Sequence, residues 1–173
     1  MTRFVADTSG LVSLGITAGN DPDPLGICLQ EYDVLVPETV VDELREIGSH
    51  DDRHGRAAGA ILDRTDDLGV RSVSLDDDFP LDDGENASVT LANGVDAALF
   101  CCDEFNHLGL IHASLADTRL VTTPTVLSVL VRRDLLSAHE ALDVLESISR
   151  ARSWKSNSYV RRARSLLESE ASP

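Results

Sequence analysis

Four acidic side chains stand where a fold built on parallel strands would bring carboxylates together. Asp7 and Asp103 each follow a short apolar run. Glu43 borders the apolar stripe of one expected helix, and Glu85 lies in the first turn of another. Gathered carboxylates repel one another unless they share a cation, and hard oxygen ligands suit Mg²⁺ or Mn²⁺. Such ions polarise a phosphodiester and activate water, so the cluster predicts metal-dependent phosphodiester chemistry.

Alternating apolar runs and amphipathic segments predict the elements that position these acids. Strands are expected at 3–6, 32–36, 70–75, 97–102 and 119–121. Helices are expected at 9–16, 25–30, 38–47, 57–68, 84–94, 105–115, 124–131, 138–148 and 159–167. Because the connections are too long for hairpins, the strands should be parallel. The sequence therefore predicts an α/β fold, a three-layer α/β/α sandwich around a central parallel sheet of about five strands, whose carboxyl-end rim would hold the site.

The C-terminal part differs in charge from the rest. We expect an α/β domain over residues 1–136 and a helical extension packed on it over residues 137–173. Between Ser147 and Leu167 the chain has no acid and six cations, Arg150, Arg152, Lys155, Arg161, Arg162 and Arg164. Arg161 and Arg162 are the expected contacts to substrate phosphates. Trp154 and Tyr159 either stack on exposed bases or hold the terminal helix on the domain.

The overall composition is strongly acidic. Thirty Asp and Glu residues against 15 Lys and Arg give a formal charge of −15, and Lys155 is the single lysine. A surface of this kind tolerates molar salt, so we expect a halophilic, archaeal source. It also opposes non-specific nucleic-acid binding without local cations. Apolar runs fall short of the roughly 18 residues of a membrane span, and Asp7 interrupts any export signal, so a cytoplasmic protein without membrane association is expected.

Cysteines and histidines show no pattern of their own. Cys28, Cys101 and Cys102 have neither a CxxC spacing nor zinc-like spacing to histidine, and they are interpreted as small buried hydrophobes. The five histidines are scattered, and no Gly-x-Ser-x-Gly elbow is present. The sequence thus predicts neither a soft-metal site nor a Ser/His/Asp hydrolase, and no histidine is expected in the mechanism.

The ordered acidic motifs resemble those of PIN domains. The segments concerned are Val5–Ser9, Val36–Leu44, Asp83–Ala87 and Asp103–Glu104, and the similarity spans about residues 3–150. The resemblance implies a PIN-like fold and a Mg²⁺- or Mn²⁺-dependent endoribonuclease, the chemistry of many prokaryotic toxins. RNA as substrate, a small antitoxin partner and a homodimer are further implications. The resemblance nominates Asp7, Glu43, Glu85 and Asp103 as catalytic metal-site acids, with Glu104 as an additional metal ligand.

Two departures from the family pattern concern substrate positioning. A Thr122–Thr125 turn stands where relatives have a Gly-Thr-Leu-Gly-like turn, and Asn106 and His107 stand where relatives tend to carry an Arg. Ser9 and Thr123 are the remaining expected substrate-side contacts.

Each of these residues also has a purely structural interpretation. Asp7, Asp103, Ser9 and Thr123 could cap helices, Glu85 could complete a capping box with Asp82, and Glu43 and Glu104 could be solvated surface acids. For the whole protein, the alternative is a catalytically inactive PIN-fold interaction module. A metal-dependent phosphatase is disfavoured because Asp7-Thr8-Ser9 lacks a second Asp.

Overall fold

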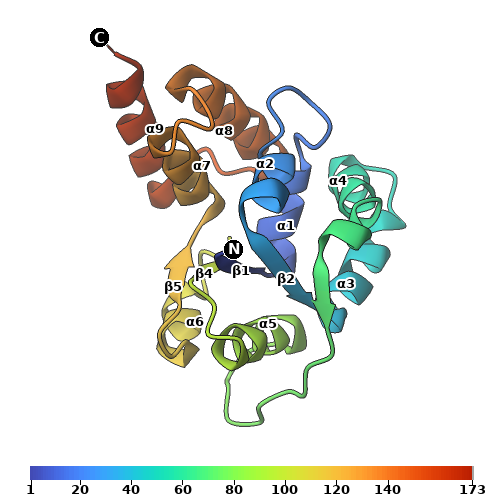
Figure 1. Cartoon of the computed structure of the whole chain (residues 1–173). Coiled ribbons are helices and arrows are strands. Elements are labelled where there is room, and N and C mark those ends of the chain that lie inside the picture. Colours follow the sequence, from blue (N-terminus) through green and yellow to red (C-terminus); the bar gives the residue numbers. More distant parts are fainter. Residues whose placement is uncertain (173) are drawn as a thin grey trace.

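The computed structural model describes residues 1–172 and is built around a five-stranded parallel sheet (Figure 1). The strands are β1 (Arg3–Ala6), β2 (Asp33–Pro37), β3 (Gly69–Arg71), β4 (Leu99–Cys101) and β5 (Arg119–Val121). Their order is β3-β2-β1-β4-β5, and every pairing is parallel. The chain therefore starts at the centre of the sheet, builds one side, and returns to build the other.

Helices cover both faces of this sheet and confirm the predicted α/β/α sandwich. They are α1 (Thr8–Gly15), α2 (Pro24–Glu31), α3 (Glu38–Gly48), α4 (Arg53–Leu62), α5 (Asp83–Gly94), α6 (Leu108–Ser114), α7 (Thr123–Arg132), α8 (Ala138–Arg152) and α9 (Ser158–Ala171), with a 3-10 turn at Thr65–Asp67. Helices α5 and α6 lie on one face, and the others lie on the opposite face (Figure 1).

Alternate residues of the central strands supply two separate cores. Phe4 and Ala6 of β1 pack in the cluster of α1–α4 and α7–α9, whereas Val5 packs in the cluster of α5 and α6. In the same way, Cys101 joins the first cluster, and Phe100 joins the second. Burial on both faces explains why these strands are continuously apolar in sequence.

Several elements differ from their predicted limits: β4 is shorter at Leu99–Cys101, α4 ends early at Leu62, and α8 and α9 extend to Arg152 and Ala171. Three differences have a local explanation. Strand β3 is confined to Gly69–Arg71 because it is an edge strand, paired only with β2, and it is followed by an exposed polar stretch. Helix α4 begins four residues before the predicted start because the Asp52 side chain accepts a hydrogen bond from the amide of Gly55. Helix α6 covers only Leu108–Ser114, and residues 102–107 before it form a loop at the end of β4.

The two C-terminal helices share the main core with the sheet. A capping box between Ser137 and Glu140 starts α8, and Ser153 ends it in the left-handed conformation. Leu145 of α8 and Leu167 of α9 are fully buried in the cluster that contains Phe4. Pro173, the last residue of the predicted extension, lies outside the described residues. Within residues 1–172, no helix is long and apolar enough to cross a membrane.

Candidate metal centre

Four of the five predicted acids converge on a small cavity at the carboxyl edge of the sheet. Asp7 directly follows β1, Glu43 lies on α3, Glu85 lies in the first turn of α5, and Glu104 lies in the loop after β4. The cavity has a volume of about 50 Å³ and is lined by Asp7, Thr8, Ser9, Glu43, Asp82, Gly84, Glu85 and Glu104. Four acids that are far apart in sequence therefore meet in one place, as the rim argument predicts.

Asp7 is at once a helix cap and a cavity residue. Its Oδ1 accepts hydrogen bonds from the amide of Gly10 at 2.9 Å and from the hydroxyl of Ser9 at 2.7 Å. The side chain thus caps α1 as the structural interpretation expects, while the residue also lines the cavity. Because the residue is only 3% exposed, burial raises the pKa of its carboxyl from 3.8 to about 7. A bound cation would offset the unfavourable free energy of burying the ionised Asp7 carboxylate.

Glu43 reaches the cavity from the partly buried edge of α3. Its Oε2 accepts a hydrogen bond of 2.6 Å from the hydroxyl of Thr8. Burial raises the pKa of this carboxyl, and the hydrogen bond from Thr8 opposes the shift. On the other side, the Glu43 carboxylate lies against the backbone of Gly84, where the Cβ of any other residue would collide with its Oε1. Gly84 therefore makes room for the carboxylate.

This contact predicts the effect of Gly84→Ala. The added methyl should push the mobile end of the Glu43 side chain aside rather than break the backbone, so the melting midpoint should change little. Mn²⁺ affinity, measured by calorimetry, should fall by about tenfold, in the range for losing the support of a metal ligand. Gly94→Ala in the same helix meets no atom within 4 Å and is the matched control. Equal Mn²⁺ affinity of both variants would contradict the placement of Glu43.

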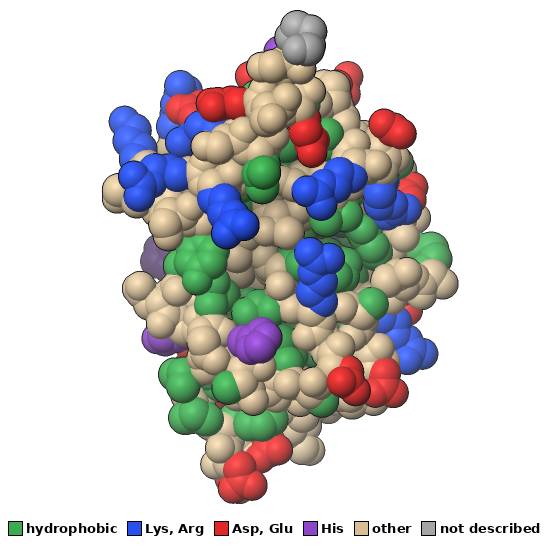
Figure 2. All heavy atoms as spheres, turned by 90° about the vertical axis from the view of Figure 1, so that its left-hand side faces the viewer, with side chains coloured by type: hydrophobic (Ala, Val, Ile, Leu, Met, Phe, Trp, Pro, Cys, Tyr) green, Lys and Arg blue, Asp and Glu red, His purple; other side chains and the backbone are tan. Residues whose placement is uncertain are grey.

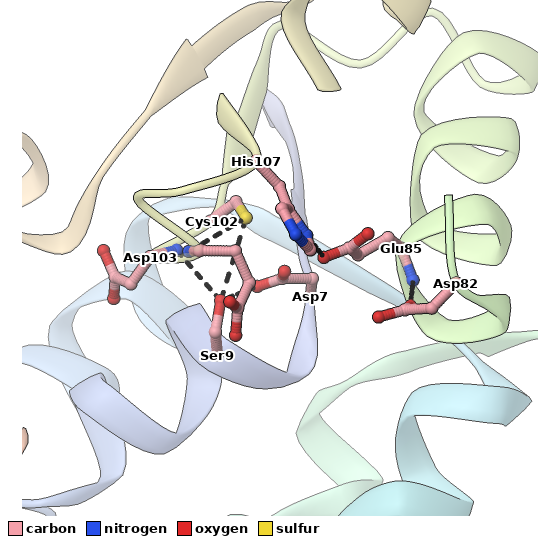
Figure 3. Close-up of polar contacts among 8 residues, drawn as sticks. Asp7, Ser9, Asp82, Glu85, Cys102, Asp103 and His107 are labelled. Atoms are coloured by element: carbon pink, nitrogen blue, oxygen red, sulfur yellow. Dashed lines mark hydrogen bonds and ion pairs between the residues drawn. The ribbon is translucent and has the colours of Figure 1, made fainter. Parts of the chain in front are cut away.

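Glu85 is paired with a histidine that the sequence analysis left out of the site. Its buried carboxylate Oε1 lies 2.9 Å from Nδ1 of His107, and this carboxylate raises the pKa of the imidazole (Figure 3). The Asp82 Oδ1 accepts a hydrogen bond of 2.8 Å from the amide of Glu85 and so caps α5. The Glu85 side chain faces His107 instead of returning to Asp82, so no capping box forms. Glu85, Glu104 and His107 each place one ligand atom within 4.8 Å of the others and could hold a metal ion.

Asp103 occupies its predicted position but faces away from the cavity. Its two carboxylate oxygens accept hydrogen bonds from Thr123, one from the amide at 2.7 Å and one from the hydroxyl at 2.6 Å. Figure 3 shows this carboxylate directed away from Glu85 and His107. We therefore leave Asp103 out of the ligand set and interpret it as the anchor between the loop after β4 and the start of α7.

Two predicted substrate contacts also receive different roles. Thr123 is fully buried and its hydroxyl is used by Asp103, so it holds the site together from behind. Ser9 lines the cavity, where its hydroxyl donates to Asp7 and accepts from the amide of Asp103 at 2.9 Å. Ser9 thus connects the ends of β1 and β4.

The two tail arginines that sequence reasoning treated as a pair are separated. Arg162 lines a groove on the α7–α9 face, whereas Arg161 is exposed but does not line that groove. Of the two aromatic residues, Trp154 is buried against the edge of Phe105, and Tyr159 is half exposed. Trp154 therefore matches the interpretation that it holds the terminal helix on the domain, and Tyr159, which also stacks on Phe105, leaves half of its side chain exposed.

His107 was missed because residues 105–115 were expected to be helical from the start. The signal available in the sequence was its position three residues after Glu104, close enough to the end of a central strand to share the same rim. The complete donor set, carboxylates with one imidazole at the edge, fits a divalent cation such as Mg²⁺ or Mn²⁺. The chain matches no protein-family model, no curated protein and no solved structure.

Proposed function

We propose that the protein is a Mg²⁺- or Mn²⁺-dependent endoribonuclease whose metal ligands are drawn from Asp7, Glu43, Glu85 and Glu104. The observation that carries this proposal is the convergence of these carboxylates on one cavity at the carboxyl edge of a parallel sheet. Among the described residues that line it, none is a Lys or Arg that could balance their charge. The order of the acidic motifs, which resembles that of PIN domains, supports RNA as the substrate.

The residues around the cavity would bind and position the cation in different ways. A divalent cation bound there would polarise the scissile phosphodiester and increase the acidity of a water molecule. The carboxylates of Glu85 and Glu104, whose ligand atoms lie within 4.8 Å of each other, would hold the cation together with those of Asp7 and Glu43 from the same cavity. The hydroxyls of Ser9 and Thr8 fix the orientation of the Asp7 and Glu43 carboxylates through hydrogen bonds. His107 contacts the carboxylate of Glu85 at 2.9 Å and, together with Glu85 and Glu104, could supply a ligand atom of its own. This arrangement needs no covalent nucleophile.

Cleavage of a labelled single-stranded RNA tests the proposal. In KCl concentrations that keep the protein folded, cleavage should require Mn²⁺ or Mg²⁺ and stop when a chelator is added. Glu43→Gln should lose most of this activity while its fold persists, because the amide keeps the shape but not the charge. Glu38→Gln, an exposed residue in the first turn of the same helix, is the control. Mn²⁺ binding without RNA cleavage would favour the inactive interaction module.

A further inference from the structure

A second hollow lies on the face formed by β5, α7 and α9. It is a groove of about 360 Å³, and three arginines from three different elements line it, Arg119, Arg132 and Arg162. The hydroxyl-bearing side chains of Thr125 and Ser128 line the groove between them. Figure 2 shows this face of the molecule, with Lys and Arg side chains gathered over its upper half.

The arginines of the groove are poorly neutralised, although the chain has a formal charge of −15. Arg132 has an acidic neighbour, Glu170, at 3.8 Å. Within residues 1–172, Arg119 and Arg162 have no carboxylate within 4.0 Å, whereas Arg164 and Arg150 of the same tail pair with Glu146. Other cations of the described residues, Arg161 among them, also have no carboxylate within 4.0 Å, so it is the grouping of three arginines in one groove that favours an anionic ligand there.

Tyr159 gives this groove an aromatic surface. The ring stacks on Phe105 with a centroid distance of 5.6 Å and an interplanar angle of 16°, and Phe105 is held in turn by the edge contact to Trp154. Tyr159 is nevertheless 50% exposed, so half of this side chain remains accessible to a ligand in the groove. A partly exposed ring that is supported by a second aromatic side chain is suited to stacking on a planar base.

The groove and the candidate metal centre meet through one short loop. Phe105, which supports Tyr159, directly follows Glu104, which lines the metal cavity. Tyr159 also lines an adjoining hollow with Leu108 and His112 of α6, the helix that follows the same loop. Tyr159 thus lies where the groove and the adjoining hollow come together, and the loop before α6 carries a residue of the metal cavity.

We propose that this groove binds single-stranded RNA, with phosphates on Arg119, Arg132 and Arg162 and a base on Tyr159, and leads the strand to the metal cavity. An acidic protein segment would also match the arginines, but it would not use the exposed aromatic side chain of Tyr159. The delivery of RNA for cleavage rests on the proposed function, whereas RNA binding in the groove does not.

Fluorescence anisotropy with a labelled oligouridine of about ten nucleotides tests this site in the full chain. A chelator prevents cleavage, and the titrations are made at several KCl concentrations that keep the protein folded. Arg162→Glu should weaken binding by about tenfold through lost phosphate contacts. Arg161→Glu makes the same charge change one residue away, outside the groove, and should stay within about twofold of wild type, since high salt screens distant charges.

Two further variants separate stacking from docking of α9. Tyr159→Ala should weaken binding by about fivefold or more, and Tyr159→Phe should retain it, because the phenyl ring still stacks. Arg119→Glu lies on β5, not on α9, so it should reproduce the effect of Arg162→Glu even if that variant alters the docking of the helix. Melting midpoints are recorded for every variant.

The outcomes test RNA binding in the groove separately from RNA cleavage at the metal cavity. If Arg161→Glu, Arg162→Glu and Arg119→Glu bind the oligouridine with equal affinity, the groove is not the RNA-binding site, whether or not RNA is cleaved. Displacement of the oligouridine by polyglutamate at similar concentrations, with no loss on Tyr159→Ala, would assign the groove to an acidic protein and would also overturn RNA binding there. Loss of oligouridine affinity in the groove variants but not in Arg161→Glu supports RNA binding in the groove, even if no preparation cleaves RNA.

Discussion

Asp7→Asn should remove metal-dependent RNA cleavage while the protein remains folded. The asparagine Oδ1 can still accept the hydrogen bonds that Asp7 accepts from Ser9 and Gly10, so α1 keeps its cap. What is lost is a negative charge in the ligand set. The initial cleavage rate should fall by more than about a hundredfold, beyond the range for losing a residue that only supports a metal ligand.

The same substitution should make the metal-free protein more stable at neutral pH, because burial of the Asp7 carboxylate is unfavourable there. Asp66→Asn, on the exposed 3-10 turn, is the charge-matched control for both measurements. Unchanged cleavage by Asp7→Asn would remove this residue from the mechanism.

Mn²⁺ should raise the melting midpoint strongly at pH 8 and little at pH 5. Ligand carboxylates must be ionised to bind the cation, and the pKa of Asp7 is raised to about 7. A ligand that binds only the folded state at a hundredfold excess over its Kd stabilises it by about 2.7 kcal/mol. For a chain of this size that corresponds to about 5–10 °C, which differential scanning fluorimetry in concentrated KCl resolves readily.

The metal-free protein should show the opposite pH dependence. The folded state keeps a proton on Asp7 that the unfolded chain loses above its ordinary pKa of 3.8. The stability from this proton is fully present below about pH 4 and is lost as the pH rises through about 7. Burial raises the pKa values of Glu43 and Asp103 as well, so they act in the same direction. A free energy of unfolding that falls equally steeply in Asp7→Asn over this range would contradict the contribution of Asp7.

The sequence predicts the positions of site residues well where the residue type alone determines the local structure. The apolar run before Asp7 places that carboxylate at the end of a central strand, and Asp-Thr-Ser supplies both the cap and the hydroxyl that holds it. Gly84 before Glu85 is similar, since its missing side chain leaves room for the Glu43 carboxylate. For these acids, periodicity and the carboxyl-edge rule are enough to predict convergence.

Side-chain direction was not predictable at Asp103 and His107. Asp103 turns toward Thr123, which is 20 residues further along the chain and comes close only through the pairing of β4 with β5. His107 meets Glu85 because the chain from Asp103 to His107 forms a loop instead of the first turn of a helix. Both outcomes depend on tertiary packing that a single sequence does not encode locally.

By contrast, the sequence does predict which side of α9 packs on the domain. Val160, Ala163 and Leu167 are the buried apolar positions of the helix, and they set which residues flank the buried stripe. Tyr159 and Arg162 fall three residues apart on one flank of that stripe and face the groove, whereas Arg161 falls elsewhere. Treating Arg161 and Arg162 as equivalent overlooked that periodicity.

Anomalous diffraction from crystals soaked in Mn²⁺ shows whether this cavity is a metal centre, because it locates the cation without relying on activity. We expect a peak in the cavity between α1, α3 and α5, at coordination distance, about 2.0–2.6 Å, from carboxylate oxygens of Asp7, Glu43, Glu85 or Glu104. The peak should disappear in crystals of Asp7→Asn soaked in the same way. Mn²⁺ peaks confined to surface acids such as Asp76–Asp78, with none in the cavity, would contradict the assignment of this site as a metal centre.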